Sequence, residues 1–369
     1  MAYILTQSQI LIQSKMDVVL SKTLAGSATT EAIPMNGGDG RNSYANNSSL
    51  QRFVVDRSKS MIDEAIENYL DIGTCPSSNT FRIADLGCST GPNTFIAMQN
   101  IIEAIDHVYF NDHASNDFNT LFVFLPPEKP YFAAGVPGSF HTRLFPKGSL
   151  HVAHSSTSLQ WLSQVPKEVL DINSPAYNRG RIHYANAKNQ VVEAYSAQYT
   201  RDMDAFLYAR AEEVVCGGLV VLIVPAIPDE TSPSQSRMES LYDILGSCLM
   251  DMAKTGLVEE AKVDSFNVQE YSTTPQGFKK LVERNGCFNT ERIVDILPEE
   301  NKMRPPAQIL SGHIRAAVEG VIKSHFGCDE NMIDHLFHHL YPKKIEDAFA
   351  GSTMAMEKKT MLFVLLKRK

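Results

Sequence analysis

The sequence has no long apolar run and no closely spaced pair of cysteines. A helix that crosses a bilayer needs about 20 consecutive apolar residues, and no run among the 369 residues approaches that length. Without a Cys-x-x-Cys pair, neither a zinc ribbon nor a disulfide scaffold is expected. We therefore expect a cytoplasmic protein that binds no membrane and keeps free thiols. The six cysteines are Cys75, Cys88, Cys216, Cys248, Cys287 and Cys328.

Positive charge is also scarce. The chain has 34 Lys and Arg against 42 Asp and Glu, a formal net charge of -8, and no long basic run. Nucleic acids and anionic membranes repel such a protein, so neither is an expected partner. With 43% hydrophobic and 21% charged residues, the composition is typical of a soluble globular protein. Its length fits one large domain or two ordinary ones.

The first 34 residues differ from the rest. They include "YILTQSQILIQSK", in which Gln and Ser interrupt the apolar residues, so a clean signal-peptide core is missing. We expect residues 1–34 to form a flexible leader. Because basic residues are few here, an organelle transit peptide is only an alternative interpretation.

Beyond the leader, helical and strand-like patterns alternate. Apolar residues recur at helical spacing from Ser48 onward, and "LVVLIVPA" is apolar throughout, as in a strand covered on both faces. This alternation predicts an open α/β sheet that carries a helical cap. The expected order is a helix from Ser48, a strand at 80–84, a helix at 93–105, strands at 107–112, 120–127 and 131–140, a helix at 192–215, a strand at 219–226, a mostly helical section at 234–348 and a last strand at 360–369.

The stretch "RIADLGCSTGPNTF" (82–95) interrupts the first strand with a tight turn. In open α/β sheets, ligands bind outside the carboxyl ends of the strands, where this turn lies. Gly87 and Gly91 would let the backbone approach a ligand, and Asp85 offers an acceptor to a hydroxyl or amino group. The spacing is not G-x-G-x-x-G, which disfavours a pyrophosphate site. Alternatively, the glycines only form the turn and Asp85 only caps it.

Several long motifs follow one another along the chain. They are "MNGGDGRNSYANNSSLQ" (35–51), "IADLGCSTGPNTF" (83–95), "FNDHASNDFNTLF" (110–122), "GVPGSFHTRLFP" (135–146), "HSSTSLQWLSQVPKE" (154–168), "YNRGRI" (177–182) and "VDSFNVQEY" (263–271). Taken in this order, they resemble the plant SABATH family of S-adenosylmethionine (SAM)-dependent methyltransferases, and the resemblance runs from Met35 to Lys369. It implies a Rossmann-like class I methyltransferase core with an α-helical cap, SAM as methyl donor and a homodimer.

The resemblance also implies a division of the chain and a set of SAM-binding residues. The core would span 35–233, completed by 349–369, and the mostly helical cap would span 234–348 and line the substrate pocket. The residues implied for SAM are Tyr44, Ser48, Asp85, Gly87, Cys88 and Asn93 around the methionine part and the loop, Asp112 and His113 at the ribose, Ser139 and Phe140 at the adenine, and Ser156 and Thr157 between SAM and substrate.

Gln51 and Trp161 match the residues that hold the substrate carboxylate in the acid-methylating members. A carboxylate is already ionised at pH 7, so methyl transfer needs positioning and no general base. Two alternatives stay open: "SSLQ" (48–51) also fits a helix capping box, and Trp161 could be an ordinary core residue. Other positions that match the substrate pocket are Thr157, Gln160, Leu241, Tyr242, His313 and Ile314, although helically spaced apolar residues are more often plain core.

The family resemblance further implies a peripheral Mg²⁺ site formed by Asn178, Asp264, the Phe266 carbonyl and Asn267. The alternative is that these are ordinary loop residues.

The sequence departs from the family pattern at three points. The connection before Asp112 is short, Thr157 replaces the usual Tyr, and Gln160 resembles the residue of some xanthine methyltransferases. These departures concern the substrate, while Gln51 favours an acid. We predict a carboxyl methyltransferase that esterifies a small plant acid. The sequence most resembles the branch acting on iridoid or terpenoid acids, and an aromatic acid is a further candidate. N-methylation of a xanthine-like ring is one alternative, and a SAM-binding protein without turnover is another.

Overall fold

The computed structural model describes residues 33–70, 80–99, 101, 106–297, 305–350 and 360–369. Apart from Ile33 and Pro34, the predicted leader lies outside these residues. Within them, seven strands form one sheet in the order β3-β2-β1-β4-β5-β7-β6. The strands are β1 (Arg82–Leu86), β2 (His107–Asp112), β3 (Phe132–Pro137), β4 (Leu150–Ser156), β5 (Val214–Ala226), β6 (Phe288–Asp295) and β7 (Thr360–Arg368).

The sheet is mixed. Strands β1 to β5 pair in parallel, while β7 runs antiparallel to both β5 and β6. Parallel neighbours require crossover connections, which the intervening helices provide. The predicted open α/β sheet is therefore confirmed.

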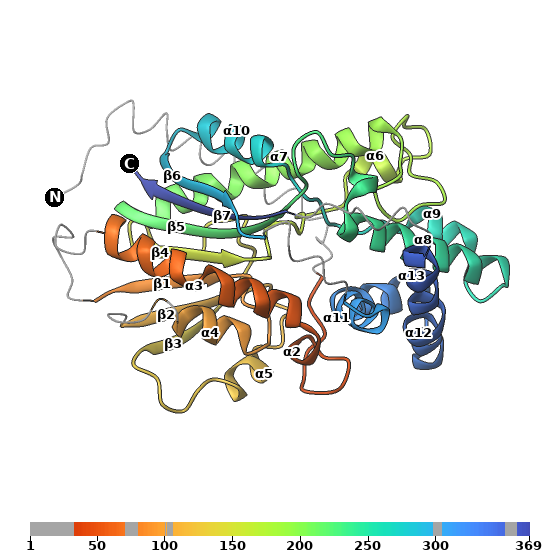
Figure 1. The fold of residues 1–369 in the computed structure, drawn as a ribbon, viewed down its shortest axis with the longest axis horizontal. Coiled ribbons are helices and arrows are strands. Elements are labelled where there is room, and N and C mark those ends of the chain that lie inside the picture. The colour runs from red at the N-terminus through yellow and green to blue at the C-terminus, as the bar shows by residue number, and fades with distance from the viewer. Residues whose placement is uncertain (1–32, 71–79, 100, 102–105, 298–304, 351–359) are drawn as a thin grey trace, which may run out of the picture. The chain divides into compact units, whose positions relative to one another are not determined.

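Helices cover both faces of the sheet (Figure 1). Successive strand residues point to opposite faces of the sheet. A separate cluster of buried apolar residues therefore lies on each face. Ala84 and Val220 pack with α7 (Asn189–Glu213) and α10 (Pro275–Asn285). Ile83 and Val221 pack with α3 (Ser49–Tyr69) and α4 (Asn93–Gln99). This double coverage explains why β5 is apolar throughout.

A third apolar cluster holds together a group of helices, which Figure 1 shows beyond the carboxyl ends of the parallel strands. This is the region for which the sequence predicts a helical cap. Its helices are α8 (Arg237–Lys254), α9 (Glu260–Ser265), α11 (Ala307–Phe326), α12 (Glu330–His335), the π-helical turn Leu336–Leu340 and α13 (Tyr341–Ala350). Short elements elsewhere are α2 (Tyr44–Asn47), α5 (Phe118–Val123), α6 (Lys167–Leu170) and the 3₁₀ turn Pro233–Gln235.

Three secondary-structure predictions are corrected. The apolar run 120–127 was expected to be a strand, but α5 covers its first half, because the Asp117 side chain accepts from Thr120 N at 3.0 Å and caps a helix. The section 234–348 is not a uniform helical block, since β6 lies inside it and forms the sheet edge. Helix α4 ends at Gln99, before the predicted 105; residues 100 and 102–105 lie outside the described residues.

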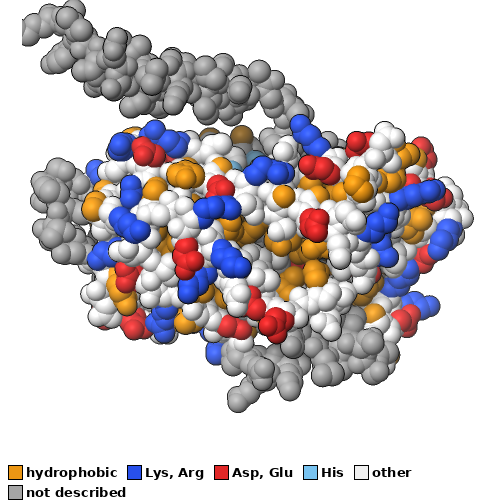
Figure 2. Space-filling view, turned by 90° about the horizontal axis from the view of Figure 1, so that it is seen from above, with side chains coloured by type: hydrophobic (Ala, Val, Ile, Leu, Met, Phe, Trp, Pro, Cys, Tyr) orange, Lys and Arg blue, Asp and Glu red, His pale blue; other side chains and the backbone are white. Residues whose placement is uncertain are grey.

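The surface and the thiols agree with the composition. Figure 2 shows basic and acidic side chains intermingled on the face it displays. In the part of the chain that the structure describes, no helix is both long enough and apolar enough to span a bilayer. The prediction of free thiols is confirmed for the five described cysteines, and Cys75 lies outside the described residues.

Candidate active site

The carboxyl ends of β1, β2 and β4 meet at one edge of the sheet. In the register, Asp85 pairs with Phe110 of β2 and with His154 of β4. The turn after β1 is fixed to the end of β2, because Gly87 N and Cys88 N both donate to Asn111 O, at 2.9 and 3.0 Å. The predicted ligand turn therefore lies at the strand ends, as expected for an open α/β sheet.

A small cavity opens beside this turn. Eight of its lining residues were predicted from the sequence as site residues, and four were not. The predicted ones are Tyr44, Gln51, Asp85, Gly87, Cys88, Asn93, Ser156 and Thr157; the others are Val55, Thr94, Ala97 and His154. The structure thus gathers residues from α2, α3, α4, β1 and β4 at one place.

The backbone around this cavity adopts unusual conformations. Gly87 has φ +80°, and a Cβ at this position would overlap Ser158. Ser89 and Thr157 have φ +55° and +53° although neither is glycine. Left-handed conformations of non-glycine residues cost free energy and cluster at functional sites, and a β-branched residue such as Thr is least suited to them. The strain marks the ends of β1 and β4 as a functional region.

The carboxyl group of Asp85 is held within the protein. One oxygen accepts from the Thr94 hydroxyl, and the other lies 2.8 Å from His154 Nδ1. Asp85 and His154 are 4% and 1% exposed, so water does not replace these partners. The sequence suggested a free acceptor at Asp85, but each of its oxygens already accepts one hydrogen bond, and any bond to a ligand would be additional.

Asp112 ends β2 as predicted, despite the short connection before it. Its carboxylate accepts from Ser89 N and from His113 N, both at 2.7 Å. Burial raises the pKa of Asp112 to about 6, and burial lowers the pKa of His113. A half-buried carboxylate at a strand end favours a ligand that donates hydrogen bonds or carries positive charge.

Ser139 and Phe140 lie in the loop after β3, and a buried ion pair holds this loop. Arg210 and Glu213, both fully buried at the end of α7, contact each other at 2.6 Å. Arg210 Nη1 donates to Phe140 O at 2.8 Å, and Glu213 Oε1 accepts from the backbone of the same loop at Phe145 N, at 3.0 Å. Sequence reasoning missed this pair, because nothing local marks a buried Arg.

Gln51 lies in the first turn of α3 and lines the cavity. Its Oε1 atom is buried and has no hydrogen-bond partner among the described residues. Ser48 makes no side-chain cap bond to the helix; its hydroxyl instead accepts from Asn93 Nδ2 at 2.9 Å. The capping-box alternative is therefore wrong, and the Gln51 amide remains available to a ligand.

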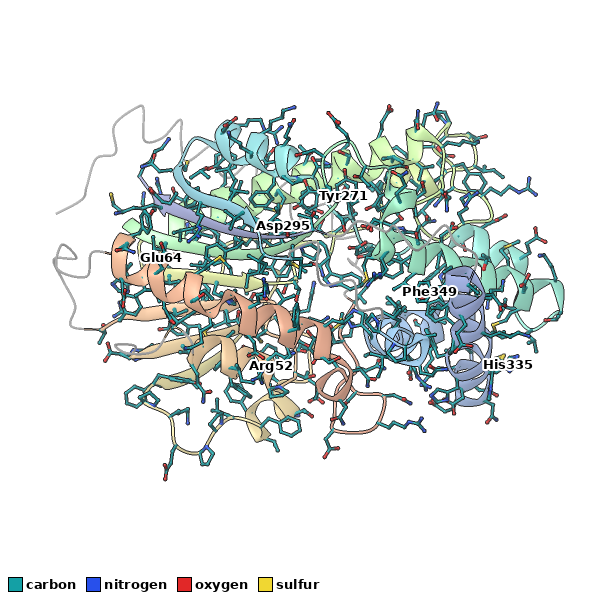
Figure 3. All side chains as sticks on the ribbon, viewed as in Figure 1. Arg52, Glu64, Tyr271, Asp295, His335 and Phe349 are labelled. Atoms are coloured by element: carbon teal, nitrogen blue, oxygen red, sulfur yellow. The ribbon has the colours of Figure 1, made fainter. Side chains whose placement is uncertain are left out.

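Trp161 does not appear in the lining of this cavity; it packs half-buried against the cap cluster, as Leu50 does. The predicted pocket residues Leu241, Tyr242 and Ile314 are fully buried in that same cluster. Leu50 and Gln51 therefore link the cavity to the Trp161 region. Figure 3 labels Arg52, the next residue of α3, and Tyr271, whose N–H donates to Gln160 O at 2.9 Å.

Two further predicted substrate residues bond to the backbone. Gln160 Nε2 donates to Thr157 O at 2.8 Å, while its Oε1 is buried without a partner in the described part of the chain. His313 on α11 is 8% exposed, and its Nδ1 lies 3.4 Å from Asn47 O. Burial lowers the pKa of His313, which favours the neutral imidazole.

The predicted metal residues lie near one another, but two of them are bonded together. Asn178 Nδ2 donates to Asn267 Oδ1 at 2.7 Å, and Asp264 Oδ1 accepts from Gly180 N at 2.7 Å. Phe266 ends α9 next to them. Their oxygens are the hard donors that Mg²⁺ prefers. Among the described residues, no group of three or more His, Cys, Asp or Glu is arranged to hold a metal ion.

Sequence reasoning also missed a buried acidic group beside Trp161. Glu270 pairs with Trp161 in an isolated antiparallel bridge, so the two side chains emerge on the same side. Its Oε2 lies 3.3 Å from His183 Nε2, and both residues are at most 2% exposed. Burial raises the pKa of Glu270 to about 8 and lowers that of His183 to about 4. Glu270 lies in "VDSFNVQEY", but nothing in that motif signals burial.

Comparison with known proteins identifies the family. The model of the SAM dependent carboxyl methyltransferase family matches residues 30–369. The chain belongs to this family. The predicted SABATH membership, the class I methyltransferase fold, the reaction class and SAM as methyl donor are thereby confirmed.

Individual relatives support the same family. The chain is 46% identical to loganic acid O-methyltransferase of Catharanthus roseus, over 92% of this chain and 95% of that protein. A solved structure described as loganic acid methyltransferase with SAH (S-adenosylhomocysteine) matches with a TM-score of 0.86 and 44% identity, over 91% of this chain and 99% of that one. Paraxanthine methyltransferase 2 of Arabidopsis thaliana is 37% identical, over 82% and 89%.

Proposed function

We propose that this methyltransferase converts a small terpenoid or aromatic carboxylic acid, of the kind that loganic acid represents, into its methyl ester. The observation that carries the substrate class is the 46% identity to loganic acid O-methyltransferase over 92% of the chain. The Gln51 amide is compatible with an acid substrate, because Gln51 lines the cavity and its Nε2 could donate a hydrogen bond to a carboxylate.

The proposed mechanism depends on positioning. SAM supplies an electrophilic methyl group on a sulfonium. Gln51 and the Trp161 indole N–H would orient the substrate carboxylate, which is ionised at pH 7 and needs no base. Alignment of the reacting atoms supplies several kcal/mol towards the barrier. The apolar cluster around Leu241, Tyr242 and Ile314 would exclude water, which otherwise solvates the nucleophile.

The SAM-binding residues form the second part of the proposal. The cavity residues Tyr44, Asp85, Gly87 and Cys88 would surround the methionine part. The remaining ones are Ser48 and Asn93, which bond to each other, Asp112 and His113 at the end of β2, Ser139 and Phe140 in the loop that Arg210 holds, and Ser156 and Thr157 at the end of β4.

A xanthine-like substrate is the second candidate. Gln160 favours it, as does the similarity to paraxanthine methyltransferase 2. However, Gln160 Nε2 already donates one hydrogen to Thr157 O, so its buried oxygen and its second Nε2 hydrogen are what remain to recognise a xanthine-like ring. The carboxyl methyltransferase family match makes this candidate the weaker one.

A radiolabelled methyl-transfer screen tests the proposal with a panel of iridoid, terpenoid and aromatic acids and of xanthines. We expect transfer to at least one acid. Gln51→Ala should lower kcat/KM for that acid about 10- to 100-fold, the usual loss for a hydrogen bond to a charged group. The control is Arg52→Ala, which removes only a surface ion pair with Asp56 and should leave the rate unchanged.

Three outcomes count against the proposal. Equal rates for Gln51→Ala and Arg52→Ala would remove Gln51 from the site. Transfer to xanthines alone would favour the second candidate. Binding of SAH without transfer to any substrate would favour a SAM-binding protein without turnover.

We further propose a homodimer, a cytoplasmic location and Mg²⁺ binding at Asn178, Asp264, Phe266 and Asn267. The family resemblance supports the dimer. The oxygen donors of the four residues support the ion, although the ion would have to displace the Asn178–Asn267 hydrogen bond. Light scattering and titration calorimetry with Mg²⁺ test the first and last of these.

A further inference from the structure

A buried His–Asp pair lies beneath the cavity, and sequence reasoning assigned it no role beyond Asp85. Asp85 on β1 and His154 on β4 are register partners, and Asp85 Oδ1 lies 2.8 Å from His154 Nδ1. The Thr94 hydroxyl of α4 donates to the other Asp85 oxygen. His154 is 1% exposed and lines the cavity. Its ring is therefore fixed from one side and faces the cavity with the other.

This arrangement determines the tautomer of His154. A carboxylate only accepts hydrogen bonds, so Nδ1 must carry the proton that Asp85 accepts. In a neutral imidazole, Nε2 then presents a lone pair, as in other carboxylate-oriented histidines. Nε2 is buried and has no hydrogen-bond partner in the part of the chain that the structure describes.

His154 Nε2 is not alone. Gln51 Oε1 and Ser156 Oγ line the same cavity, and both are also buried without partners among the described residues. A buried polar atom that stays unpaired is destabilising, so three around one cavity indicate a polar ligand. Two of the three are acceptors, and Asp85 and Asp112 add negative charge nearby. The ligand group that complements this cavity is a cation with several N–H donors.

We propose that His154 Nε2 accepts a hydrogen bond from the α-ammonium group of the methionine part of SAM, with Asp85 fixing the imidazole tautomer. This rests on SAM as the methyl donor. His154 is then a binding residue that orients the methionine end of SAM, and Asp85 acts on SAM partly through His154.

The test is a thermodynamic cycle of binding affinities, in which the imidazole nitrogen of the protein and the amine of the ligand are removed separately. Titration calorimetry would measure the Kd of SAH, of its deaminated analogue and of its decarboxylated analogue. The variant is His154→Asn, whose amide nitrogen can still donate to Asp85 while Nε2 is lost. We expect about a 10-fold weaker Kd for SAH and for the decarboxylated analogue, and an unchanged Kd for the deaminated analogue.

Two further variants serve as controls. His107→Asn makes the same change at the opposite end of the sheet, where His107 begins β2 and also has a buried nitrogen with no hydrogen-bond partner among the residues that the structure describes; its SAH affinity should equal that of the wild type. His154→Gln carries a side-chain oxygen at about the position of Nε2 and should recover part of the SAH affinity. Urea unfolding of each variant confirms that it folds.

Each other outcome has a distinct meaning. An equal loss of affinity for SAH and its deaminated analogue would overturn the proposal, since His154 would then act only on the protein or on a bound water. A loss that disappears with the decarboxylated analogue would also overturn it, because Nε2 would then donate to the SAM carboxylate. If the wild-type protein bound no SAH, the assignment of SAM itself would fail.

Discussion

Replacing Gly87 by Ala should destabilise the protein strongly, because two separate penalties act at this position. Gly87 has φ +80°, a conformation that L-residues with a side chain rarely adopt. The new Cβ would also overlap the Oγ and Cβ atoms of Ser158, and it would lie 3.5 Å from Phe140 Cε1. Ser158 therefore has to move.

The magnitude follows from these contacts. The left-handed conformation costs an alanine about 1–2 kcal/mol. Moving Ser158 removes the hydrogen bond of its hydroxyl, whose single hydrogen is shared between Gly87 O at 3.0 Å and Ser156 O at 3.1 Å, and this bond is worth about 1 kcal/mol. We expect a total loss of about 2–3 kcal/mol in the free energy of unfolding, a large part of the ~5–15 kcal/mol typical of folded proteins.

Urea unfolding followed by circular dichroism measures this loss against a matched control. Gly286, at the end of α10, has φ +72°, and apart from its chain neighbours no described residue has an atom within 4 Å of the position that a Cβ would take there, so Gly286→Ala carries only the backbone penalty. Adding Ser158→Gly to Gly87→Ala should remove the overlap and recover part of the loss. If Gly87→Ala cost no more than Gly286→Ala, or if the second substitution recovered nothing, the reasoning about Ser158 would be refuted.

Two further predictions concern buried ionisable groups. Burial raises the pKa of Glu270 from 4.5 to about 8. Between these two pH values the folded state keeps a proton that the unfolded chain releases. The free energy of unfolding should therefore fall as pH rises through that interval, by at most ~5 kcal/mol. Glu270→Gln should lose this dependence in urea unfolding between pH 5 and 9; an unchanged slope would contradict the assignment. Arg210→Met leaves the Glu213 carboxylate buried without its cation, so it should cost about 3–5 kcal/mol in the free energy of unfolding. It should also weaken SAH binding through the loop at Phe140; an unchanged SAH affinity in calorimetry would show that this loop does not contribute to SAH binding.

The local pattern was enough to predict much of the sheet. Apolar runs bounded by Gly and Pro indicated β1, β3 and β5, and helical spacing indicated α3 and α7. It failed where non-local pairing or a single cap decides the structure. The β6 sequence "FNTERIVD" is mostly polar, and it becomes a strand only by pairing with β7, which lies about 70 residues further along the chain. A short apolar run such as 120–127 fits a strand or a helix equally well until its cap is known.

The site shows the same division between local and non-local information. Gly87 and Asp85 belong to one short motif, so the sequence revealed them together. His154 is 69 residues from Asp85, and only the register of β1 with β4 brings the two together. Glu270 is a second example, because its raised pKa comes from burial beside Trp161 and His183, which no local pattern records. Sequence motifs therefore located the site, but its electrostatics required the fold.

Several energetically unfavourable features are concentrated at the carboxyl ends of β1 and β4, and poor packing does not explain them. Gly87 and Thr157 have positive φ, and three buried polar atoms without partners in the described chain face the same cavity, while the sheet on either side is close-packed and apolar. A folded protein keeps such costs where they prepare a site, since acceptors fixed before binding need no reorganisation when a ligand arrives. The apolar clusters on the two faces of the sheet provide the folding free energy that offsets these unfavourable features at the strand ends. Substitutions that stabilise this edge are therefore expected to weaken SAM binding.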